Sequence, residues 1–372
     1  MSADMWPEKR TVVLLFGGRS SEHEISCVTA AGILKAIDRS RFTVIPVGIT
    51  KRGATVLLDE SDLAGFRLEA GALPEVPENG TRVLWPASAE TRTLSVILTS
   101  GEVRSLGHVD VVFPTLHGPY GEDGTVQGML DLVDLPYVGN GVLASALCMD
   151  KHALKTLLVA AGVPVAPWRA VTRGQLEREP RLREHLDEGL TYPLFVKPAR
   201  AGSSVGVTRV TASDDLPAAL EVAFAEDSVV LVESGVRGRE VEIAVLQGRG
   251  GDGPRTSAVI GEIVFTGRDF YDYEAKYLGA PGVELRLPAP VTEAELRALR
   301  AAAITAFEAA QCAGLARVDF FLTADGPVLN EINTLPGFTP ISMYPRLWEE
   351  SGLGYTALIT ELIELALEER DA

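Results

Sequence analysis

Apolar runs and amphipathic stretches alternate along the first 140 residues of the chain. Residues 11–16, 42–50 and 109–118 are apolar enough to be buried strands, and residues 26–37 carry apolar side chains at helical spacing. Strands that alternate with helices in this way are typical of a parallel sheet covered by helices. We therefore predict an N-terminal parallel α/β domain over residues 1–140.

Residues 52–106 do not follow this alternation. Only residues 82–86 and 93–99 look like strands, and turn-forming residues separate them. We interpret the segment as an insertion that lies away from the motifs described below, and the sequence leaves its role open.

A mixed pattern follows from residue 141 onward. Apolar spacing from 141 to 162 predicts one helix that ends at Gly162, shortly before Pro164. The next expected elements are strands at 192–198, 207–210 and 228–234 and a helix near 214–225. We predict that they form a central α+β subdomain over residues 141–234.

Residues 235–372 are predicted to form a second α+β domain. In chain order the expected elements are strands at 239–246 and 256–265, a polar and aromatic loop at 266–290, a helix at 292–312, a strand pair at 316–334 and a last helix at 353–369. The alternation of apolar and polar side chains in these strands is typical of an antiparallel sheet.

The strand pair at 316–334 brings polar side chains together. Residues 324–326 are predicted to form a three-residue turn, because Gly326 can adopt the left-handed backbone that such a turn requires. The facing pairs are then Thr323 with Pro327, Asp319 with Glu331, and Arg317 with Asn333. Alternate side chains of a strand share one face, so two carboxylates, an amide and an arginine converge.

Opposed carboxylates repel each other unless a cation lies between them. Asp319, Glu331 and Asn333 offer oxygen donors without His or Cys, which favours Mg²⁺ or Mn²⁺ over Zn²⁺. Mg²⁺ with few protein ligands usually completes its coordination with substrate phosphate. We therefore interpret the hairpin as a metal and phosphate site, and the alternative is an ordinary solvated strand edge.

A glycine- and serine-rich loop at 197–207 follows a strand. Its backbone amides can approach an anion closely, because glycine and serine leave room around them. The loop lacks the Walker spacing, since Lys197 precedes the glycines instead of following them. Alone it could be a simple turn, but together with a metal site it indicates that nucleotide phosphate binds near Lys197, Ser203 and Ser204.

Two further loops follow apolar strands of the N-terminal domain. Residues 16–26 join a strand to a helix through a glycine pair but lack the third glycine and the acidic residue of a dinucleotide site. Glu22 is predicted to lie in the first turn of that helix, where it either receives an ammonium group or caps the helix. His117 follows the strand at 109–118, at the sheet edge where ligands bind in α/β proteins, although a single histidine is usually structural.

The length, net charge and cysteine content limit the number of domains, the partners and the cellular compartment that we expect. The 372 residues are enough for two or three domains, and the net charge of −17 argues against nucleic-acid or anionic membrane partners. Cys27, Cys148 and Cys312 are far apart and show neither a disulfide pattern nor zinc spacing, which suits a reducing cytoplasm. The apolar run near the N-terminus is too short for a signal peptide or a membrane span, so we expect a cytoplasmic protein.

Together these motifs resemble the D-alanine–D-alanine ligases of the ATP-grasp superfamily. In this order along nearly the whole chain they are GGRSSEHEIS (17–26), LHGPYGEDGTVQG (116–128), KPARAGSSVGV (197–207), DFYDYEAKY (269–277), ARVDF (316–320) and NEINTLPGFT (330–339). The resemblance implies an ATP-grasp fold in which two α+β domains sandwich the nucleotide. It also implies a ligase of cell wall biogenesis that supports peptidoglycan synthesis and cell shape.

The implied reaction uses ATP to phosphorylate one D-alanine, and the amine of a second D-alanine then attacks the acyl phosphate. The resemblance implies two Mg²⁺ or Mn²⁺ ions at Asp319, Glu331 and Asn333, a possible monovalent cation, and a homodimer. The base that deprotonates the second amine is left open between Tyr277, Ser203 and the phosphate itself.

The resemblance also assigns the remaining residues. The implied ATP-binding residues are Lys151, Lys197, Ser204, Glu233, Glu240 and Lys276, and the implied catalytic or substrate-binding residues are Glu22, His117, Ser203, Tyr277, Arg317, Gly337 and Ser342. Glu22, Ser203 and Tyr277 would form a hydrogen-bonded triad that closes the 266–290 loop, and Tyr277 favours dipeptide formation. The alternatives are a D-lactate or D-serine ligase, or a non-catalytic nucleotide-binding protein on the same fold.

Overall fold

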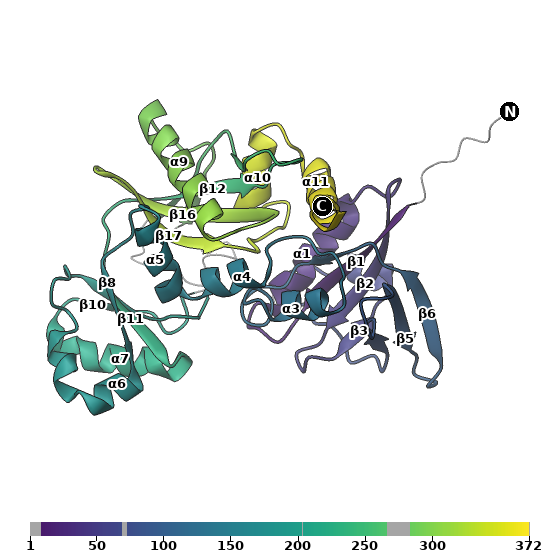
Figure 1. The fold of residues 1–372 in the computed structure, drawn as a ribbon, viewed down its shortest axis with the longest axis horizontal. Helices are drawn as coiled ribbons and strands as arrows, with labels where there is room; N and C mark the ends of the chain where they lie inside the picture. Colours follow the sequence, from purple (N-terminus) through teal and green to yellow (C-terminus); the bar gives the residue numbers. More distant parts are fainter. Residues whose placement is uncertain (1–8, 69–72, 203, 266–282, 372) are drawn as a thin grey trace.

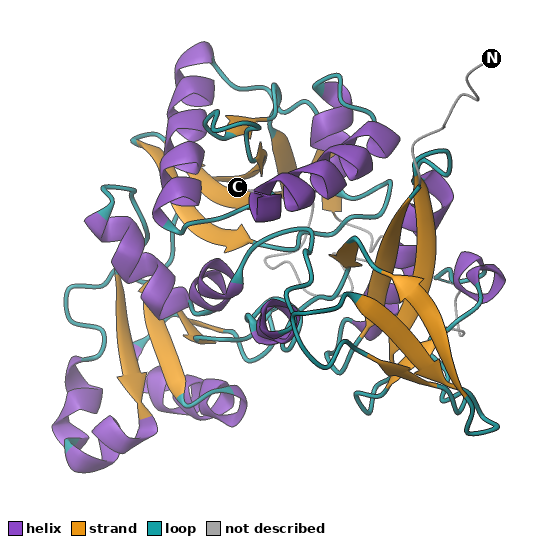
Figure 2. Ribbon diagram, turned by 45° about the vertical axis from the view of Figure 1, so that its right-hand side comes forward, coloured by secondary structure: helices purple, strands orange, loops and turns teal. Residues whose placement is uncertain are grey.

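The structure is a computed structural model that describes residues 9–68, 73–202, 204–265 and 283–371. Figure 1 shows the N-terminal part at one end of the molecule, the central part at the other, and the C-terminal strands between and above them. Helices flank the sheets in each part (Figure 2). In the part of the chain that the structure describes, no helix has both the length and the apolarity needed to cross a membrane.

The N-terminal sheet is built around β1 (Arg10–Gly17). This strand runs parallel to β2 (Phe42–Ile49) on one side and to β7 (Val111–Pro114) on the other. At the edge of the sheet, β3 (Thr55–Leu57) pairs antiparallel with β2. Even-numbered residues of β1 pack toward α1 (His23–Ala36) and α11 (Tyr355–Asp371), and odd-numbered residues pack toward α3 (Thr125–Leu132). Burial on both faces explains why β1 is an uninterrupted apolar run, and the predicted parallel α/β arrangement is confirmed.

The predicted insertion at 52–106 forms structure of its own. It contains β3, the short helix α2 (Glu60–Ala64) and an antiparallel sheet of β4 (Arg82–Leu84), β5 (Thr93–Ile97) and β6 (Val103–His108). Two of these strands were predicted. The sequence prediction missed β6 because its side chains are mostly exposed and show no apolar alternation. Val83 and Leu94 join the core on one face of the N-terminal sheet.

The central sheet has its helices on one side only. Its strand order is β10 (Thr208–Val210), β9 (Leu194–Pro198), β11 (Val229–Ser234) and β8 (Trp168–Thr172), all antiparallel. The helices α6 (Arg173–Arg178) and α7 (Leu216–Glu226) pack on one face, as Figure 1 shows, and short 3₁₀ turns occupy Pro180–His185 and Ser213–Asp215. The opposite face is available to other parts of the chain.

The single helix predicted for 141–162 is wrong. The structure has α4 (Val142–Met149) and α5 (Lys151–Ala160), which meet at Asp150. The Asp150 carboxylate accepts hydrogen bonds from the backbone amides of His152 and Ala153, both at 3.0 Å. Such a cap stabilises a new helix start and lets the chain turn between two apolar helical segments.

The C-terminal sheet is antiparallel. Its order is β15 (Val283–Arg286), β14 (Gly261–Phe265), β12 (Arg239–Leu246), β16 (Leu315–Thr323) and β17 (Gly326–Asn333), and β13 (Arg255–Thr256) pairs with β12. The helix α9 (Glu293–Ala309) covers one face. Two predictions need correction, because the strand predicted at 256–265 covers only the end of β13 and, after a break, β14, and because β15 lies inside the predicted 266–290 loop.

The helix α10 (Met343–Glu350) was not predicted, because Pro345 suggests a helix break. The proline lies in the first turn, where a helix tolerates it. Both α10 and α11 contribute to the core on the N-terminal sheet, so the end of the chain returns to the part where it began. The boundaries at residues 140 and 234 stay predictions.

Candidate active site

A cleft of about 340 Å³ lies between the central sheet and the C-terminal sheet. Lys151, Lys197, Ser204 and Glu233 line it from the central part, and Glu240, Asp319 and Glu331 line it from β12, β16 and β17. The structure thus brings together every predicted nucleotide-binding residue that it describes, and it places two of the three predicted metal ligands in the same cleft. The volume is within the range of small-molecule sites.

The strand pair brings its carboxylates together as predicted, but its turn and the register next to the turn differ from the prediction. Thr323 pairs with Gly326, so the turn has two residues and the predicted pairing with Pro327 is wrong. A β-bulge between Asp319 and Phe320 then shifts the register by one residue, which leaves Asn330 extra. The bulge restores the pairings of Asp319 with Glu331 and of Arg317 with Asn333, which are confirmed.

Arg317 binds the carboxylates on this face of the sheet. Its Nε and Nη2 each donate to Asp319 at 2.7 Å, and its Nε lies 3.2 Å from Glu242 Oε2. Burial acts to lower the pKa of Arg317, but Asp319 and Glu242 outweigh it and raise that pKa well above its ordinary value. The guanidinium therefore stays charged and offsets the repulsion between the two closely spaced carboxyl groups.

The donor set fits a divalent ion that is shared with phosphate. Asn333 Nδ2 donates to Asp319 Oδ2 at 3.0 Å, so its amide lies beside the paired carboxylates. Within the described ranges, no three His, Cys, Asp or Glu side chains are grouped closely enough to hold a metal by themselves. A bound ion therefore needs oxygen donors from Asn333 and from a ligand, which is the behaviour expected of Mg²⁺ and Mn²⁺ with nucleotides.

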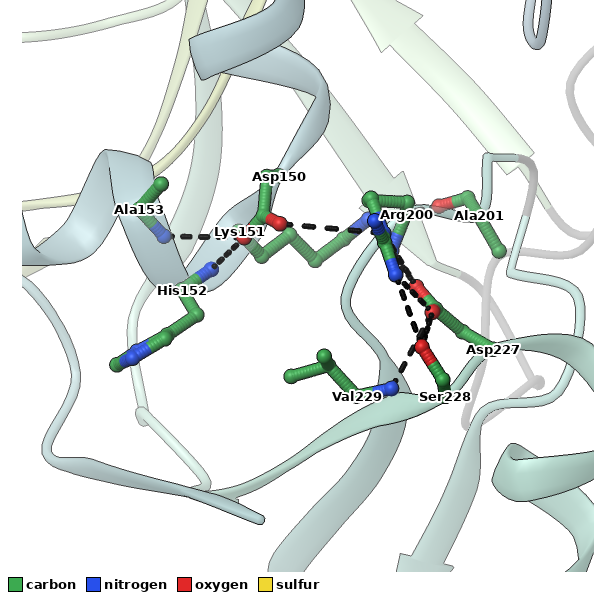
Figure 3. Close-up of polar contacts among 9 residues, drawn as sticks. All are labelled: Asp150, Lys151, His152, Ala153, Arg200, Ala201, Asp227, Ser228 and Val229. Carbon is green, nitrogen blue, oxygen red and sulfur yellow. Dashed lines mark hydrogen bonds and ion pairs between the residues drawn. The ribbon is translucent and has the colours of Figure 1, made fainter. Parts of the chain in front are cut away.

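Lys151 connects α5 to the glycine-rich loop. Its ammonium donates to the Ala201 carbonyl at 2.7 Å, and its backbone amide donates to the Ala199 carbonyl at 3.1 Å. Figure 3 shows Arg200 beside this contact, where it binds both oxygens of Asp227, with its Nη2 at 2.6 Å from Oδ1. These contacts fix the start of the loop next to Lys151, so both can contact one anionic ligand.

The middle of the loop, at Gly202, lies close to Glu22 of the N-terminal domain. A carbon placed on Gly202 as a side chain would lie 3.7 Å from Glu22 Oε2, and one on Gly118 would lie 3.2 Å away. Glu22 itself is buried and directly precedes α1, instead of lying in its first turn as predicted. The buried carboxylate thus lies where three segments of the chain meet, which suits a bound ammonium group.

His117 and the 334–342 segment complete this region. His117 Nδ1 donates to the Leu335 carbonyl at 3.1 Å, and burial lowers its pKa, so the neutral imidazole is favoured. A side-chain carbon on Gly337 would lie 3.2 Å from Ser342 Oγ, which accepts a hydrogen bond from the Thr339 amide. The predicted substrate residues therefore lie on two loops that contact each other.

Three predicted residues cannot be placed. Ser203, Lys276 and Tyr277 lie outside the described residues, so the predicted triad and the γ-phosphate contact stay predictions.

Two acidic residues of the site were missed by the sequence prediction. Glu242 pairs with Asp319 across β12 and β16, and the alternation of Glu240 and Glu242 along β12 was an available signal. Glu122 accepts hydrogen bonds from the backbone amides of Gly118, at 2.6 Å, and Leu335. Burial and the nearby Glu22 raise the pKa of Glu122 to about 8. The sequence motif at 116–128 contains Glu122, but only the fold shows that this carboxyl group is buried.

Comparisons with known protein families agree with this geometry. The family model for the D-ala D-ala ligase N-terminus matches residues 11–140, and the model for the D-ala D-ala ligase C-terminus matches residues 157–364. A D-alanine–D-alanine ligase from Pseudarthrobacter chlorophenolicus is 50% identical, covering 96% of this chain and 94% of that protein. A ligase of the same name from Kineococcus radiotolerans is also 50% identical, covering 96% of this chain and 97% of that protein.

Solved structures share the fold. The VanG D-Ala:D-Ser ligase from Enterococcus faecalis superposes with a TM-score of 0.82 at 35% identity, covering 96% of this chain and 100% of that one. The D-alanine–D-alanine ligase from Coxiella burnetii gives a TM-score of 0.81 at 34% identity, covering 98% of this chain and 95% of that one.

Proposed function

The chain belongs to the D-alanine–D-alanine ligase family of ATP-grasp enzymes, and we propose that it joins two D-alanines through an acyl phosphate formed from ATP. The product, D-alanyl-D-alanine, is used in peptidoglycan synthesis. The observation that carries the proposal is the cleft itself, which has lysines and a glycine-rich loop on one wall and paired carboxylates on the other. Such a site can hold a triphosphate, with the lysine ammonium groups on one side and divalent ions that the carboxylates would bind on the other.

The first step transfers the γ-phosphoryl group. A carboxylate oxygen of the first D-alanine bonds to the γ-phosphorus as the bond to the β,γ-bridging oxygen breaks and ADP leaves. Lys151 and Lys197 contact the phosphates, and Glu233 and Glu240 bind adenine and ribose. Asp319, Glu331 and Asn333 would hold Mg²⁺ or Mn²⁺, which neutralises phosphate charge and aligns the transferred group when it is bound.

The second step forms the peptide bond. The neutral amine of the second D-alanine attacks the acyl carbon, phosphate leaves with its electron pair, and the proton that the amine gives up passes to the phosphate, to Tyr277 or to Ser203. Glu22 holds the ammonium group of the first D-alanine, His117 lies near that substrate, and Ser342 binds the carboxylate of the second. Arg317 and the Gly337 amide stabilise the oxyanion of the tetrahedral intermediate.

Loop residues complete the proposal. Lys276 reaches the γ-phosphate, and Ser203 and Tyr277 link the loop to Glu22. Closure of the loop matters because water would hydrolyse an acyl phosphate. The contact between the glycine-rich loop and Glu22 supports this part of the proposal. We also propose a cytoplasmic homodimer, in keeping with the family, and a possible monovalent cation.

One observation favours a second candidate. The VanG D-Ala:D-Ser ligase shares the fold over nearly the whole chain, so D-serine is a possible second substrate. Its identity of 35% is lower than the 50% of the D-alanine–D-alanine ligases, so we favour D-alanine.

A coupled phosphate assay tests the proposal. With ATP, Mg²⁺ and D-alanine we expect one phosphate per D-alanyl-D-alanine, and no release above background with L-alanine. D-serine or D-lactate added to limiting D-alanine should yield little mixed product. A non-catalytic nucleotide-binding protein would release no phosphate with D-alanine, and mixed product in excess would favour the second candidate.

A further inference from the structure

A buried lysine lies behind the nucleotide-binding wall of the cleft. Lys155 is one helical turn beyond Lys151 on α5 and is only 2% exposed, although lysine is almost never buried without a partner. Its ammonium lies 2.7 Å from Glu233 Oε2 and 3.3 Å from the Ala166 carbonyl. It also lies 5.5 Å from the ring centre of Trp168.

Glu233 is shared between two lysines. Its Oε1 lies 2.9 Å from Lys197 Nζ, and its Oε2 contacts Lys155. Glu233 and Lys197 line the cleft, whereas Lys155 approaches from the side of α5. Burial acts to raise the pKa of Glu233, but the attraction of Lys197 and Lys155 and their hydrogen bonds outweigh it and lower that pKa. Glu233 is therefore ionised at neutral pH.

The charges in this Lys155–Glu233–Lys197 cluster do not cancel. Burial lowers the pKa of Lys155, but the charge of Glu233 and its hydrogen bond oppose that effect. Two ammonium groups and one carboxylate then leave one net positive charge next to the cleft. If Lys155 were neutral, Glu233 would compensate the charge of Lys197, and nothing of that charge would remain for a ligand. The whole chain carries a net charge of −17, so local cations must attract a triphosphate.

We propose that Lys155 is a positioning residue that supplies the countercharge of Glu233 and thereby leaves the charge of Lys197 available to nucleotide phosphates. The proposal rests on the nucleotide site described above and adds a residue that does not contact the ligand. A purely structural role is the competing explanation, because Lys155 also contacts Trp168, the residue paired with Glu233 across β8 and β11.

The two explanations differ in which part of the nucleotide is bound less tightly. We would measure inhibition constants of ADP and of adenosine against ATP for the wild type and for Lys155→Met, which keeps the side-chain length. Loss of countercharge should weaken ADP binding at least tenfold, about 1.4 kcal/mol, and change adenosine binding less than threefold. A structural role should weaken both ligands alike, because it would displace Glu233 and the adenine-binding wall.

A double variant sharpens the test. Lys155→Met with Glu233→Gln removes one charge of each sign and restores a net charge of one at Lys197. The ratio of adenosine to ADP inhibition constants should then return to within threefold of the wild-type ratio, even if loss of Glu233 weakens adenosine itself. A neutral buried pair is also easier to accommodate than a single unpaired acid, so this variant should fold. Lys35→Met, on the exposed last turn of α1, controls for the loss of one positive charge and should leave the ratio unchanged.

The proposal is overturned if Lys155→Met leaves the ratio unchanged, or if the double variant fails to recover it. Failure of the proposed function would look different, because the wild type itself would then release no phosphate with ATP and D-alanine, and no inhibition constant could be measured for any variant. Circular dichroism and the melting temperature of each variant establish that differences in the ratio come from folded protein.

Discussion

At the scale of single residues, Arg317 and the acids around it set the charge of the carboxylate wall. Arg317 pairs with Asp319 and Glu242, and Glu331 faces Asp319 across β16 and β17 in the lining of the cleft. Glu331 is therefore placed to share a divalent ion with Asp319 and a bound phosphate. Removing its charge should affect metal and phosphate binding more than folding.

Glu331→Gln tests this role. We expect phosphate release to fall about 100-fold or more, because loss of a metal ligand should exceed the 10- to 100-fold effects of residues that only orient ligands. The melting temperature should stay close to that of the wild type, since Glu331 is not part of the apolar core. Asp325→Asn, in the exposed turn of the same hairpin, is the matched control and should keep full turnover. Near-normal turnover of Glu331→Gln would contradict the metal assignment.

Glu122 makes the free energy of unfolding depend on pH. At pH values between the ordinary pKa of glutamate and the raised pKa of about 8, Glu122 is protonated in the folded chain but ionised in the unfolded chain. Unfolding then releases a proton, so this group makes the protein less stable as pH rises. The Glu122→Gln variant lacks the effect. Its free energy of unfolding, relative to the wild type, should increase by about 1 kcal/mol per pH unit from pH 5 to 7.5.

Urea titrations at three pH values, without nucleotide and with a metal chelator, measure this difference. A difference that does not vary with pH would mean that Glu122 ionises normally in the folded chain. The sequence could not reveal this residue as unusual, because the carboxylate is buried only after the 116–128 loop meets Leu335 and Glu22.

At the scale of elements, the hairpin of β16 and β17 shows how far pattern reasoning reaches. The sequence correctly predicted which polar side chains face each other, because alternation and the spacing of Asp319 and Glu331 constrain the pairing. It could not separate a three-residue turn from a two-residue turn followed by a bulge, since both give the same register at the site. The pairing near the turn was therefore wrong while the pairing at the site was right.

The break between α4 and α5 was hidden for a different reason. Apolar spacing continues through residue 150, and only the hydrogen bonds of Asp150 to the next helix show that a new helix begins there. The break matters for function because it places Lys151 in the first turn of α5, beside the glycine-rich loop.

Asp150→Ala should therefore affect both stability and nucleotide binding. Loss of the cap should cost about 1 kcal/mol of unfolding free energy, and the KM for ATP should rise several-fold as Lys151 is held less firmly. Thr292→Ala removes the cap of α9, a residue that does not line the cleft, and should cost similar stability without changing KM. Equal KM values in the two variants would show that the cap does not position Lys151.

At the scale of the whole molecule, the active site forms only where parts of the chain that are distant in sequence pack together. The nucleotide cleft forms between the central and C-terminal sheets, and the proposed D-alanine site forms where the N-terminal loops meet residues 335–342. Local patterns predicted the sheets and several site residues. They could not predict that α11 packs on the N-terminal sheet or that Lys155 is buried behind Glu233, because both depend on distant contacts.

The central claim is that the two walls of the cleft direct the γ-phosphoryl group of ATP onto a D-alanine carboxylate. Incubation with D-alanine labelled with ¹⁸O in its carboxyl group, ATP and Mg²⁺, followed by mass spectrometry of the released phosphate, tests it most directly. We predict that each phosphate released with dipeptide carries one ¹⁸O atom from the substrate. Dipeptide formed together with unlabelled phosphate would contradict the account, because the carboxylate would not have been phosphorylated.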